Sequence, residues 1–332
     1  MKKNRLLIIS QLLVLVFFSA CTNDDEALLT APEQGVDQSY REVLSLTKDK
    51  AKYNPGEEVN FTVNGSHPNT VVRYKSLGQV IGEESLGATS WSWTPPADDF
   101  RGYMVELVKT TEGEETVLGT VAVDVSSNWT RFPRYGFLSE FNNVPAAQRN
   151  RVLNNLKDFH INGLQYYDWH DKHHIPLPTD DMGNAQDSWT DLFHRPVDLA
   201  TVEGYIAAGH ERNMASMFYN LLFGVWNADP EDNVKDEWLM YKDRFHNNAD
   251  GHSLGDFGDI LLTDPANEEW QEYIFNETAI VYENLNFDGW HLDQLGDRGR
   301  LYDFEGNMIP MGEGFEDFLV NLNQKFPDKK MA

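Results

Sequence analysis

The sequence predicts a multidomain chain, with an all-β domain followed by a domain in which strands and helices alternate. Between residues 40 and 126, short runs of alternating apolar residues are separated by turn residues, which is typical of antiparallel strands. After residue 128, strand-length apolar runs alternate with amphipathic helical segments, which predicts a parallel sheet covered by helices. The segment 286–297 indicates where chemistry would take place, because it has the pattern of a short buried strand that ends in Asp293. In a (β/α) barrel, the carboxyl ends of the strands carry the catalytic side chains.

The N-terminus has the features of a bacterial secretion signal. Three basic residues lie within the first five, an apolar run spans 6–18, and two small residues precede Cys21. The stretch 18–21 resembles a lipoprotein box, so we expect the signal peptide 1–20 to be removed and Cys21, the only cysteine, to be lipidated. An ordinary signal peptide is the alternative. The apolar run is too short to span a bilayer, so acyl chains would supply the anchor. We therefore expect a secreted protein that is lipid-anchored to a bacterial outer membrane at the cell surface.

Residues 21–38 are polar and are expected to form a flexible tether. The whole sequence carries a formal net charge of −26, and loss of the three basic residues in 1–20 would make it −29. Such a charge repels nucleic acid and favours a neutral or cationic ligand, so we expect no nucleic-acid partner. With 41% hydrophobic residues and nine Trp, the sequence as a whole has the composition of a folded protein.

Residues 39–127 are predicted to form an immunoglobulin-like β-sandwich. Six strands are expected, at 43–47, 59–63, 71–74, 90–93, 103–109 and 117–125. The stretch 53–61 resembles the early strands of bacterial immunoglobulin-like modules. Trp91 and Trp93 lie two residues apart and therefore share one face of a strand. A sugar platform is one interpretation of this pair, but a core or interdomain contact is favoured.

Residues 128–332 are predicted to form the N-terminal part of a (β/α)8 barrel, comprising about its first four β/α units. Strands are expected at 135–137, 161–167, 214–219 and 289–292, and helices at 145–159, 199–212, 265–284 and 314–326. Asp198 is a suitable N-cap for the second helix, and Asp264 followed by Pro265 predicts the start of the third. Two long insertions, 168–197 and 220–262, follow the second and third strands. Both fall on the side where barrels build their active sites.

Polar and aromatic side chains gather at the expected strand ends. Asp168 and its neighbours follow the second strand, Asn220 ends the third, and Asp293 ends the fourth. Aromatic rings can stack on sugar rings, while Asp, Asn and His side chains can bind hydroxyl groups. Tyr166 and Trp290 lie inside strands and are expected to be core residues. The residues alone therefore indicate a site for a neutral polysaccharide.

The histidine-rich segment 170–174 permits a different interpretation. Paired histidines with a carboxylate can hold zinc, which would indicate a metal-dependent hydrolase. The spacing fits no standard motif, however, and a polar pocket wall is favoured. Residues 229–236 and 247–259 are rich in Asp and Asn, but they lack the spacing of a calcium-binding loop. We therefore expect neither a metal ion nor another cofactor.

Three segments, in this order and spacing, resemble family 66 glycoside hydrolases. They are RYGFLSEF at 134–141, INGLQYYDWHDKHHIPL at 161–177 and FDGWHLDQLGD at 287–297. The family contains endo-dextranases and cycloisomaltooligosaccharide glucanotransferases. Its plan is also similar to that predicted here, with a secretion signal, an immunoglobulin-like module and a (β/α)8 barrel. The resemblance implies an enzyme whose ligands are dextran and isomaltooligosaccharides.

The resemblance also implies roles for individual residues. Family members retain the anomeric configuration, with an Asp as nucleophile and a Glu that acts first as acid and then as base. Asp293 corresponds to the nucleophile. The residues implied to hold the sugar are Tyr167, Asp168, Trp169 and His170, with Asn220 and Gln294 as further candidates. The implied activity is that of a retaining endo-α-1,6-glucan hydrolase, in other words a dextranase.

The sequence departs from the family in one respect. The family's acid/base Glu follows the nucleophile by several tens of residues, whereas only 39 residues follow Asp293 here. Glu305, Glu313 and Glu316 fall in the wrong elements, and Glu140 does not match the family's acid. We therefore expect the 332-residue chain to be a truncated product that is inactive by itself. A cyclodextran-forming glucanotransferase and a non-catalytic surface glycan-binding lipoprotein are the alternative functions.

Overall fold

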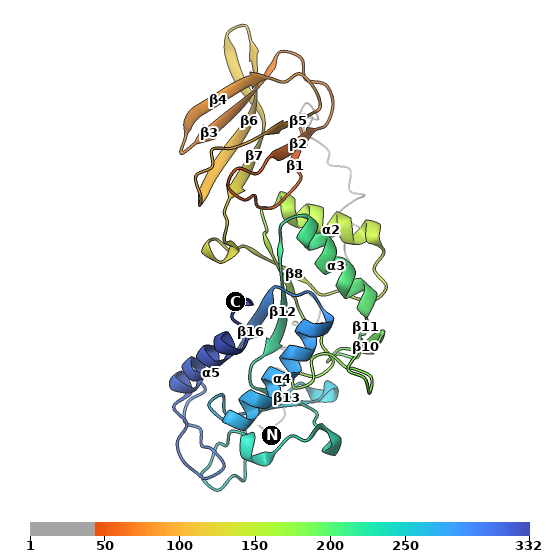
Figure 1. Cartoon of the computed structure of the whole chain (residues 1–332), viewed down its shortest axis with the longest axis vertical. Helices are drawn as coiled ribbons and strands as arrows, with labels where there is room; N and C mark the ends of the chain where they lie inside the picture. The colour runs from red at the N-terminus through yellow and green to blue at the C-terminus, as the bar shows by residue number, and fades with distance from the viewer. Residues whose placement is uncertain (1–43) are drawn as a thin grey trace, which may run out of the picture. The chain divides into compact units, whose positions relative to one another are not determined.

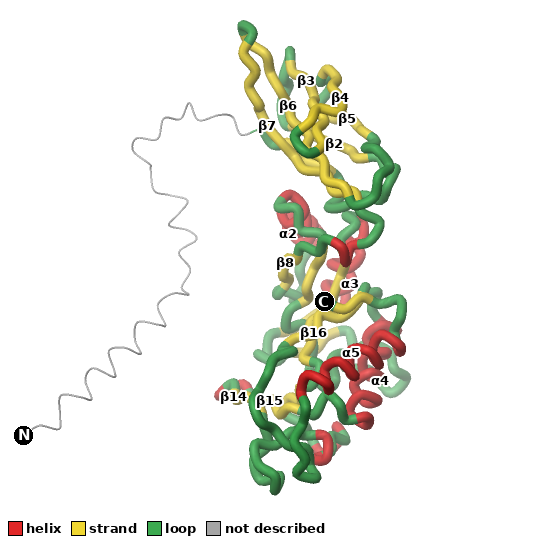
Figure 2. The backbone as a smooth tube through the Cα atoms, turned by 90° about the vertical axis from the view of Figure 1, so that its left-hand side faces the viewer, coloured by secondary structure: helices red, strands yellow, loops and turns green. Residues whose placement is uncertain are grey.

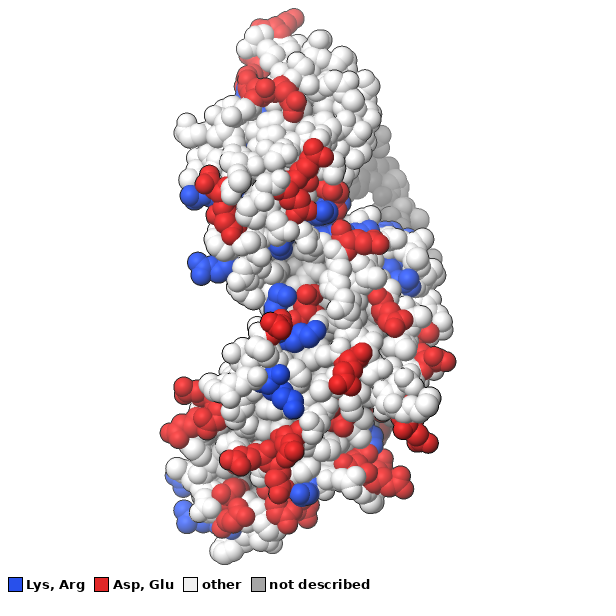
Figure 3. Space-filling model, viewed as in Figure 1, with Lys and Arg blue, Asp and Glu red and all other residues white. Residues whose placement is uncertain are grey.

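The computed structural model describes residues 44–332. The predicted signal peptide, the predicted lipidation site at Cys21 and the predicted tether lie outside the described residues. Within residues 44–332, no helix combines the length and the apolar character needed to cross a lipid bilayer. Acidic side chains dominate the charged surface on the face that Figure 3 shows, in keeping with the net charge of −26.

The first part of the described chain consists of antiparallel strands in two sheets around a shared apolar core (Figure 1). One sheet has the order β1-β2-β5 and the other the order β4-β3-β6-β7. The strands are β1 (Leu46–Lys48), β2 (Val59–Val63), β3 (Thr70–Ser76), β4 (Gln79–Ser85), β5 (Ser90–Trp93), β6 (Arg101–Thr111) and β7 (Glu114–Val125). Buried and exposed side chains alternate along β2, as expected when one face of a sheet covers a core. The immunoglobulin-like connectivity stays a prediction.

The sequence does not predict β4. Its side chains are exposed along nearly the whole strand, so no alternation of apolar and polar residues marks it.

Trp91 stacks on Phe61 with 5.1 Å between ring centroids, and Trp93 stacks on Tyr74 at 4.3 Å. Both tryptophans pack against the core between the sheets. The preference for a core contact over a sugar platform is therefore confirmed.

The second part is built on a parallel sheet with the order β17-β16-β12-β9-β8, so strands adjacent in this sheet follow one another along the chain. Its strands are β8 (Tyr135–Leu138), β9 (Gly163–Tyr166), β12 (Ala215–Leu221), β16 (Gly289–Asp293) and β17 (Lys330–Met331). The helices between them are α2 (Ala146–Asp158), α3 (Leu199–Glu211), α4 (Glu268–Asn284) and α5 (Met311–Lys325), of which α4 and α5 lie side by side (Figure 2). Parallel strands in chain order with a helix between each pair are typical of β/α barrels, although closure into a barrel stays a prediction.

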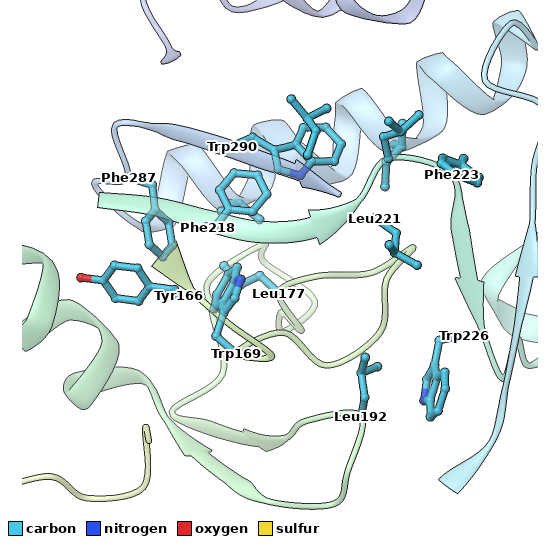
Figure 4. Packing of buried hydrophobic residues seen from close by; sticks show 14 of the residues in the cluster. Tyr166, Trp169, Leu177, Leu192, Phe218, Leu221, Phe223, Trp226, Phe287 and Trp290 are labelled. Carbon is cyan, nitrogen blue, oxygen red and sulfur yellow. The ribbon is translucent and has the colours of Figure 1, made fainter. Parts of the chain in front are cut away.

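Alternate residues of these parallel strands face opposite sides of the sheet. Tyr166, Phe218 and Trp290 are fully buried in the core between the sheet and the helices (Figure 4). Trp290 stacks on Phe218 with 5.5 Å between ring centroids. The prediction that Tyr166 and Trp290 are core residues is confirmed. By the same alternation, Tyr219 and Asp293 face the side of the sheet away from the helices.

Two helix starts were predicted from capping residues, and one of them is wrong. In α3, Asp198 caps the helix as predicted, because its side chain accepts a hydrogen bond from a backbone N–H of the first turn. α4 begins at Glu268 rather than at Pro265. Asn267 is its N-cap, while Asp264 accepts a backbone hydrogen bond within a turn that precedes the helix. Asp264 therefore stabilises the turn and not the helix end.

Two insertions follow β9 and β12 at the carboxyl ends of these strands. The first contains the hairpin β10 (Ser188–Thr190) and β11 (Pro196–Asp198), and the second contains a small sheet of β13 (Gly224–Trp226), β15 (Asp259–Leu262) and β14 (Gly251–Ser253). Single 3₁₀ turns also occur, at η1 (Trp129–Arg131), η2 (Pro230–Asp232), η3 (Asp236–Trp238) and η4 (Gly255–Phe257). Lys172 and His174 of the first insertion both bond to Asp232 of the second, which joins the two insertions.

Asp288 precedes β16 at the end of the sheet opposite to Asp293. Its carboxylate accepts hydrogen bonds from His210 Nε2 and from the Ser216 backbone N–H, both at 2.8 Å, and lies 3.3 Å from Lys330 Nζ. Burial raises the pKa of Asp288, but these hydrogen bonds and the nearby cation lower it more, so the net pKa lies below its usual value. The ionised carboxylate therefore stabilises the fold above the unfolded-state pKa, and this contribution is lost as pH falls through the folded-state pKa.

We expect Asp288→Asn to lower the free energy of unfolding of the 332-residue chain at pH 7 by about 1–3 kcal/mol, because it replaces the charged acceptor of two partly buried hydrogen bonds with a neutral one. The difference from the unmodified chain should shrink as the pH is lowered below about 4, where the unfolded aspartate takes up its proton. Urea unfolding at several pH values measures both effects. Asp328→Asn, which alters an exposed carboxylate, is the matched control. Equal stability of Asp288→Asn and the unmodified chain at pH 7 would contradict this account.

Candidate active site

Asp293 is the last residue of β16 and lies at the carboxyl end of the parallel sheet. The strand register places it beside Leu221, the last residue of β12. Its side chain is partly exposed, and Oδ2 accepts a hydrogen bond of 2.8 Å from the Tyr219 hydroxyl. Burial and the neighbouring Asp293 raise the pKa of Tyr219, so the hydroxyl keeps its proton and remains a donor. The carboxylate is thus held at one oxygen by a group of the adjacent strand.

A row of rings crosses the sheet next to this carboxylate. Tyr167 lies against Tyr219 with 4.5 Å between ring centroids, and Phe137 of β8 meets the edge of Tyr167 at 5.8 Å. His291 of β16 packs on the other side of Tyr219 at 5.5 Å. Phe137 is 60% exposed and Tyr167 is 37% exposed. Exposed ring surface beside a carboxylate is suited to stacking against a sugar ring.

Asp168 is a second carboxylate on the same side of the sheet. It follows β9 in a left-handed backbone conformation, with φ of 50°. Its Oδ2 lies 3.5 Å from Arg195 Nη2 of the first insertion. Burial raises the pKa of Asp168 to about 6; Arg195 opposes the shift, while Asp191 and Asp293 add to it. Glu140, which follows β8, lines a cavity of about 210 Å³ together with Asp191 and Arg195.

The second insertion reaches the loop that follows Asp293. His252 Nε2, from β14, lies 3.2 Å from Gln294 Oε1 and 3.1 Å from Arg298 Nη1. Arg298 in turn donates a hydrogen bond of 2.6 Å from Nε to Asp250. Gln294 is exposed and has a left-handed backbone, with φ of 67°. The structure therefore places Gln294 at the open side of the site, next to Asp293.

Three residues predicted to bind the sugar are buried beneath the site instead. Trp169, His170 and Asn220 have no exposed surface. Trp169 packs among other rings and donates a hydrogen bond of 3.2 Å from Nε1 to the Tyr219 carbonyl oxygen. Asn220 is on the opposite face of β12 from Tyr219, and its side chain bonds to His173. The three side chains therefore offer no exposed surface to a sugar in this structure, and their contact with the sugar stays a prediction.

The histidine-rich segment 170–174 forms a hydrogen-bonded support. His170 Nε2 lies 3.0 Å from His173 Nδ1, and His174 Nε2 lies 3.0 Å from Asp232 Oδ2. Burial lowers the pKa of His173 to about 4 and that of His170 well below its usual value, so both rings are neutral. Among the residues that the structure describes, no three His, Cys, Asp or Glu side chains are arranged to hold a metal ion.

Sequence reasoning missed three residues of this arrangement. Tyr219 shares its sheet face with Asp293, and the alternation within β12 could have identified it once the register was known. Arg195 and His252 belong to insertions, where no periodic pattern indicates which side chains turn toward the site. Their positions depend on contacts with Asp168 and Gln294, which come from other elements of the chain.

Comparison of this chain with known proteins identifies a family. The model of Glycosyl hydrolase family 66 matches residues 48–332. A cycloisomaltooligosaccharide glucanotransferase of Niallia circulans is 30% identical, over 96% of this chain and 34% of that protein. A dextranase of Streptococcus salivarius is 26% identical, over 61% of this chain and 26% of that protein. Among solved structures, a cycloisomaltooligosaccharide glucanotransferase of Paenibacillus sp. in complex with cycloisomaltoheptaose has a TM-score of 0.78 and 28% identity, over 88% of this chain and 44% of that one.

The chain spans about a third of the length of the Niallia circulans relatives it matches. The family match nevertheless covers nearly all of the described residues, including both sheets of the first part and the site carboxylates Asp168 and Asp293. The sequence resemblance in three separate segments is thereby confirmed. The chain belongs to glycosyl hydrolase family 66.

Proposed function

We propose that the protein to which this chain belongs is a retaining endo-α-1,6-glucan hydrolase that cleaves dextran, with Asp293 as its nucleophile. The observation that carries this proposal is the placement of Asp293 at the carboxyl end of β16, partly exposed and held by Tyr219. Asp168 supplies a second carboxylate near enough for the charge of Asp293 to act on it, and we assign it to substrate binding and not to acid/base catalysis. The names of the relatives, a dextranase and two cycloisomaltooligosaccharide glucanotransferases, support an isomalto-type glucan as substrate.

In the proposed first step, a carboxylate oxygen of Asp293 attacks the anomeric carbon of a glucosyl unit. The bond to the glycosidic oxygen breaks, and that oxygen takes a proton from a general acid as it leaves. Water then attacks the glucosyl–Asp293 ester, gives its proton to the same group and releases a product with retained configuration. The hydrogen bond from Tyr219 keeps the carboxylate oriented through both steps. We propose that the acid/base group is a glutamate outside residues 1–332.

The surroundings of Asp293 are suited to holding a neutral glucan chain. Asp168 can accept hydrogen bonds from sugar hydroxyl groups when it is ionised. The exposed faces of Tyr167 and Phe137 offer apolar surface to the carbon–hydrogen face of a pyranose ring. An acidic surface does not repel an uncharged polymer, so the net charge of −26 agrees with this substrate class.

A cyclodextran-forming glucanotransferase is the second candidate. It is favoured by the relatives with that activity in their names, which include the Paenibacillus sp. structure with bound cycloisomaltoheptaose. The two reactions share the attack by Asp293 and differ in the acceptor of the second step. Water gives hydrolysis, whereas a hydroxyl group at the far end of the same chain gives a ring.

Incubation of the full-length protein with dextran tests the proposed function. We expect new reducing ends, linear isomaltooligosaccharides, and an α-configured product at the first time points in proton NMR. Amylose, whose linkages are α-1,4, is the matched control substrate and should remain uncleaved. Cyclic products with few new reducing ends would assign the transferase instead. If the protein bound dextran but formed no product, both catalytic proposals would be refuted, and glycan binding would remain as its function.

A further inference from the structure

The tip of the β10–β11 hairpin is built around a single buried carboxylate. Asp191 is 4% exposed, and its Oδ1 accepts hydrogen bonds from the backbone N–H groups of Phe193 and Arg195 at 2.8 and 2.9 Å. The backbone of Asp191 also bonds to that of Arg195 and His194, which has a left-handed conformation with φ of 59°. The same carboxylate therefore determines the course of the whole turn.

Asp191 also fixes the direction of the Arg195 side chain. Its Oδ2 accepts a hydrogen bond of 2.6 Å from Arg195 Nε. The guanidinium carbon lies 5.4 Å from the centre of the Phe193 ring, which supports one face of the group. Because Nε and one face are occupied, the Nη2 end is directed to Asp168 Oδ2, at 3.5 Å. The Arg195 side chain remains 45% exposed, so the contact is made at the edge of the site and not in the core.

We propose that Arg195 is a positioning residue that keeps the Asp168 carboxylate ionised and oriented for substrate, and that the hairpin tip serves to hold this arginine. The inference rests on the proposed function, because it assigns a role within the same site. Arg195 belongs to the first insertion and lies in the turn that joins β10 to β11.

The charges around Asp168 explain why such a residue is needed. Asp168 is buried, and Asp191 from the hairpin and Asp293 from β16 are both anionic groups that act on it. Tyr167 and Tyr219 also face it, and burial raises the pKa of each of these phenols, so neither contributes a charge. Among the described groups that act on the Asp168 carboxylate, Arg195 is the cation that opposes its protonation. A protonated Asp168 would lose acceptor capacity toward sugar hydroxyl groups.

Glu140 belongs to the same electrostatic environment, because it lines the cavity shared with Asp191 and Arg195. Arg195 is paired with Asp168 and Asp191, and Glu140 lines the same cavity. Loss of the charge of Arg195 removes compensation from Asp168 and Asp191. The effect should be greatest on Asp168, since burial already raises its pKa to about 6.

The test is the pH profile of kcat/KM for dextran, measured on the full-length protein with Arg195→Met and Arg195→Lys. For Arg195→Met we expect the acidic limb of the kcat/KM profile to move to higher pH by about one unit. The value of kcat/KM should then fall by about tenfold near pH 5 and by less near pH 8. Arg195→Lys retains the charge and should restore most of the profile. Arg151→Met, which alters an exposed arginine of α2, is the matched control and should leave the profile unchanged.

The outcomes separate this inference from the proposed function. A loss in Arg195→Met that is equal at every pH, with no rescue by Arg195→Lys, would overturn the role assigned to Arg195 and leave the activity of the protein standing. Absence of dextran turnover in the unmodified protein would overturn the proposed function and this inference together. Thermal unfolding shows whether each variant remains folded, so that a pH-dependent loss in a folded Arg195→Met variant supports the proposal.

Discussion

Replacing Asp293 with alanine in the full-length protein is expected to lower kcat on dextran by about 10⁴-fold or more, because the covalent intermediate can no longer form. KM should change much less, since the rings and Asp168 that hold the sugar remain in place. Added azide is expected to restore part of the turnover, because the anion can enter the space left by the carboxylate and attack the anomeric carbon. The product would then be a glucosyl azide of inverted configuration.

Asp297→Asn is the matched control for this prediction. Asp297 lies in the same loop, four residues beyond Asp293, and its carboxylate is exposed and bonded only locally, to the Gly299 backbone N–H. We expect its kcat to stay within about twofold of the unmodified protein, as is usual for exposed positions outside a site. If Asp293→Ala retained substantial turnover without azide, the nucleophile would have to be another residue.

Replacing Trp169 with alanine is expected to lower the free energy of unfolding of the 332-residue chain by about 3–5 kcal/mol, the usual cost of truncating a buried aromatic side chain. Trp169 is fully buried against Phe218 and Phe287, at 6.0 and 5.2 Å between ring centroids. The substitution also removes the hydrogen bond to the Tyr219 carbonyl oxygen. Urea or thermal unfolding measures the loss, and Trp169→Phe should reduce it by restoring most of the ring volume.

The adjacent residue provides the contrasting variant. Tyr167 is 37% exposed, so Tyr167→Ala should cost much less stability than Trp169→Ala. It should instead weaken isomaltooligosaccharide binding, which calorimetry can measure, because it removes a ring that faces the site. If Trp169→Ala folded with normal stability and bound sugar more weakly, Trp169 would be a sugar-contacting residue after all, and the assignment to the core would be wrong.

The four helices of the second part and four strands of its sheet could be predicted from the sequence, the helices because they are amphipathic and the strands because they are short, largely apolar runs, whereas β17 was not predicted. α2 was expected at 145–159 and is found at Ala146–Asp158, and β12 was expected at 214–219 and is found at Ala215–Leu221. The helical pattern arises because a helix with one face on a core must repeat its apolar residues at the helical period. Every residue of β12 is buried, so this strand shows no such alternation. The hairpin and the small sheet in the insertions escaped prediction, because strands of three or four residues are too short to show a period.

The position of the candidate site was also predictable. Asp168 and Asp293 directly follow or end apolar strand segments, and parallel strands bring their carboxyl ends to one edge of a sheet. The assignment of contacting and supporting residues was not predictable, as Tyr167 and Trp169 illustrate. They lie two residues apart just beyond a strand, yet one ring is exposed at the site and the other is fully buried.

The sequence by itself therefore determined the order of the elements, the core residues within strands and the strand ends that carry Asp168 and Asp293. Only the tertiary structure decided that Tyr219 holds Asp293, that Arg195 faces Asp168, and that Trp169 turns into the core. The physical reason is the range of the interactions. Periodicity records which face of an element is buried, and it ends where the element ends. Beyond that point, the direction of a side chain depends on packing against residues that are distant in the chain.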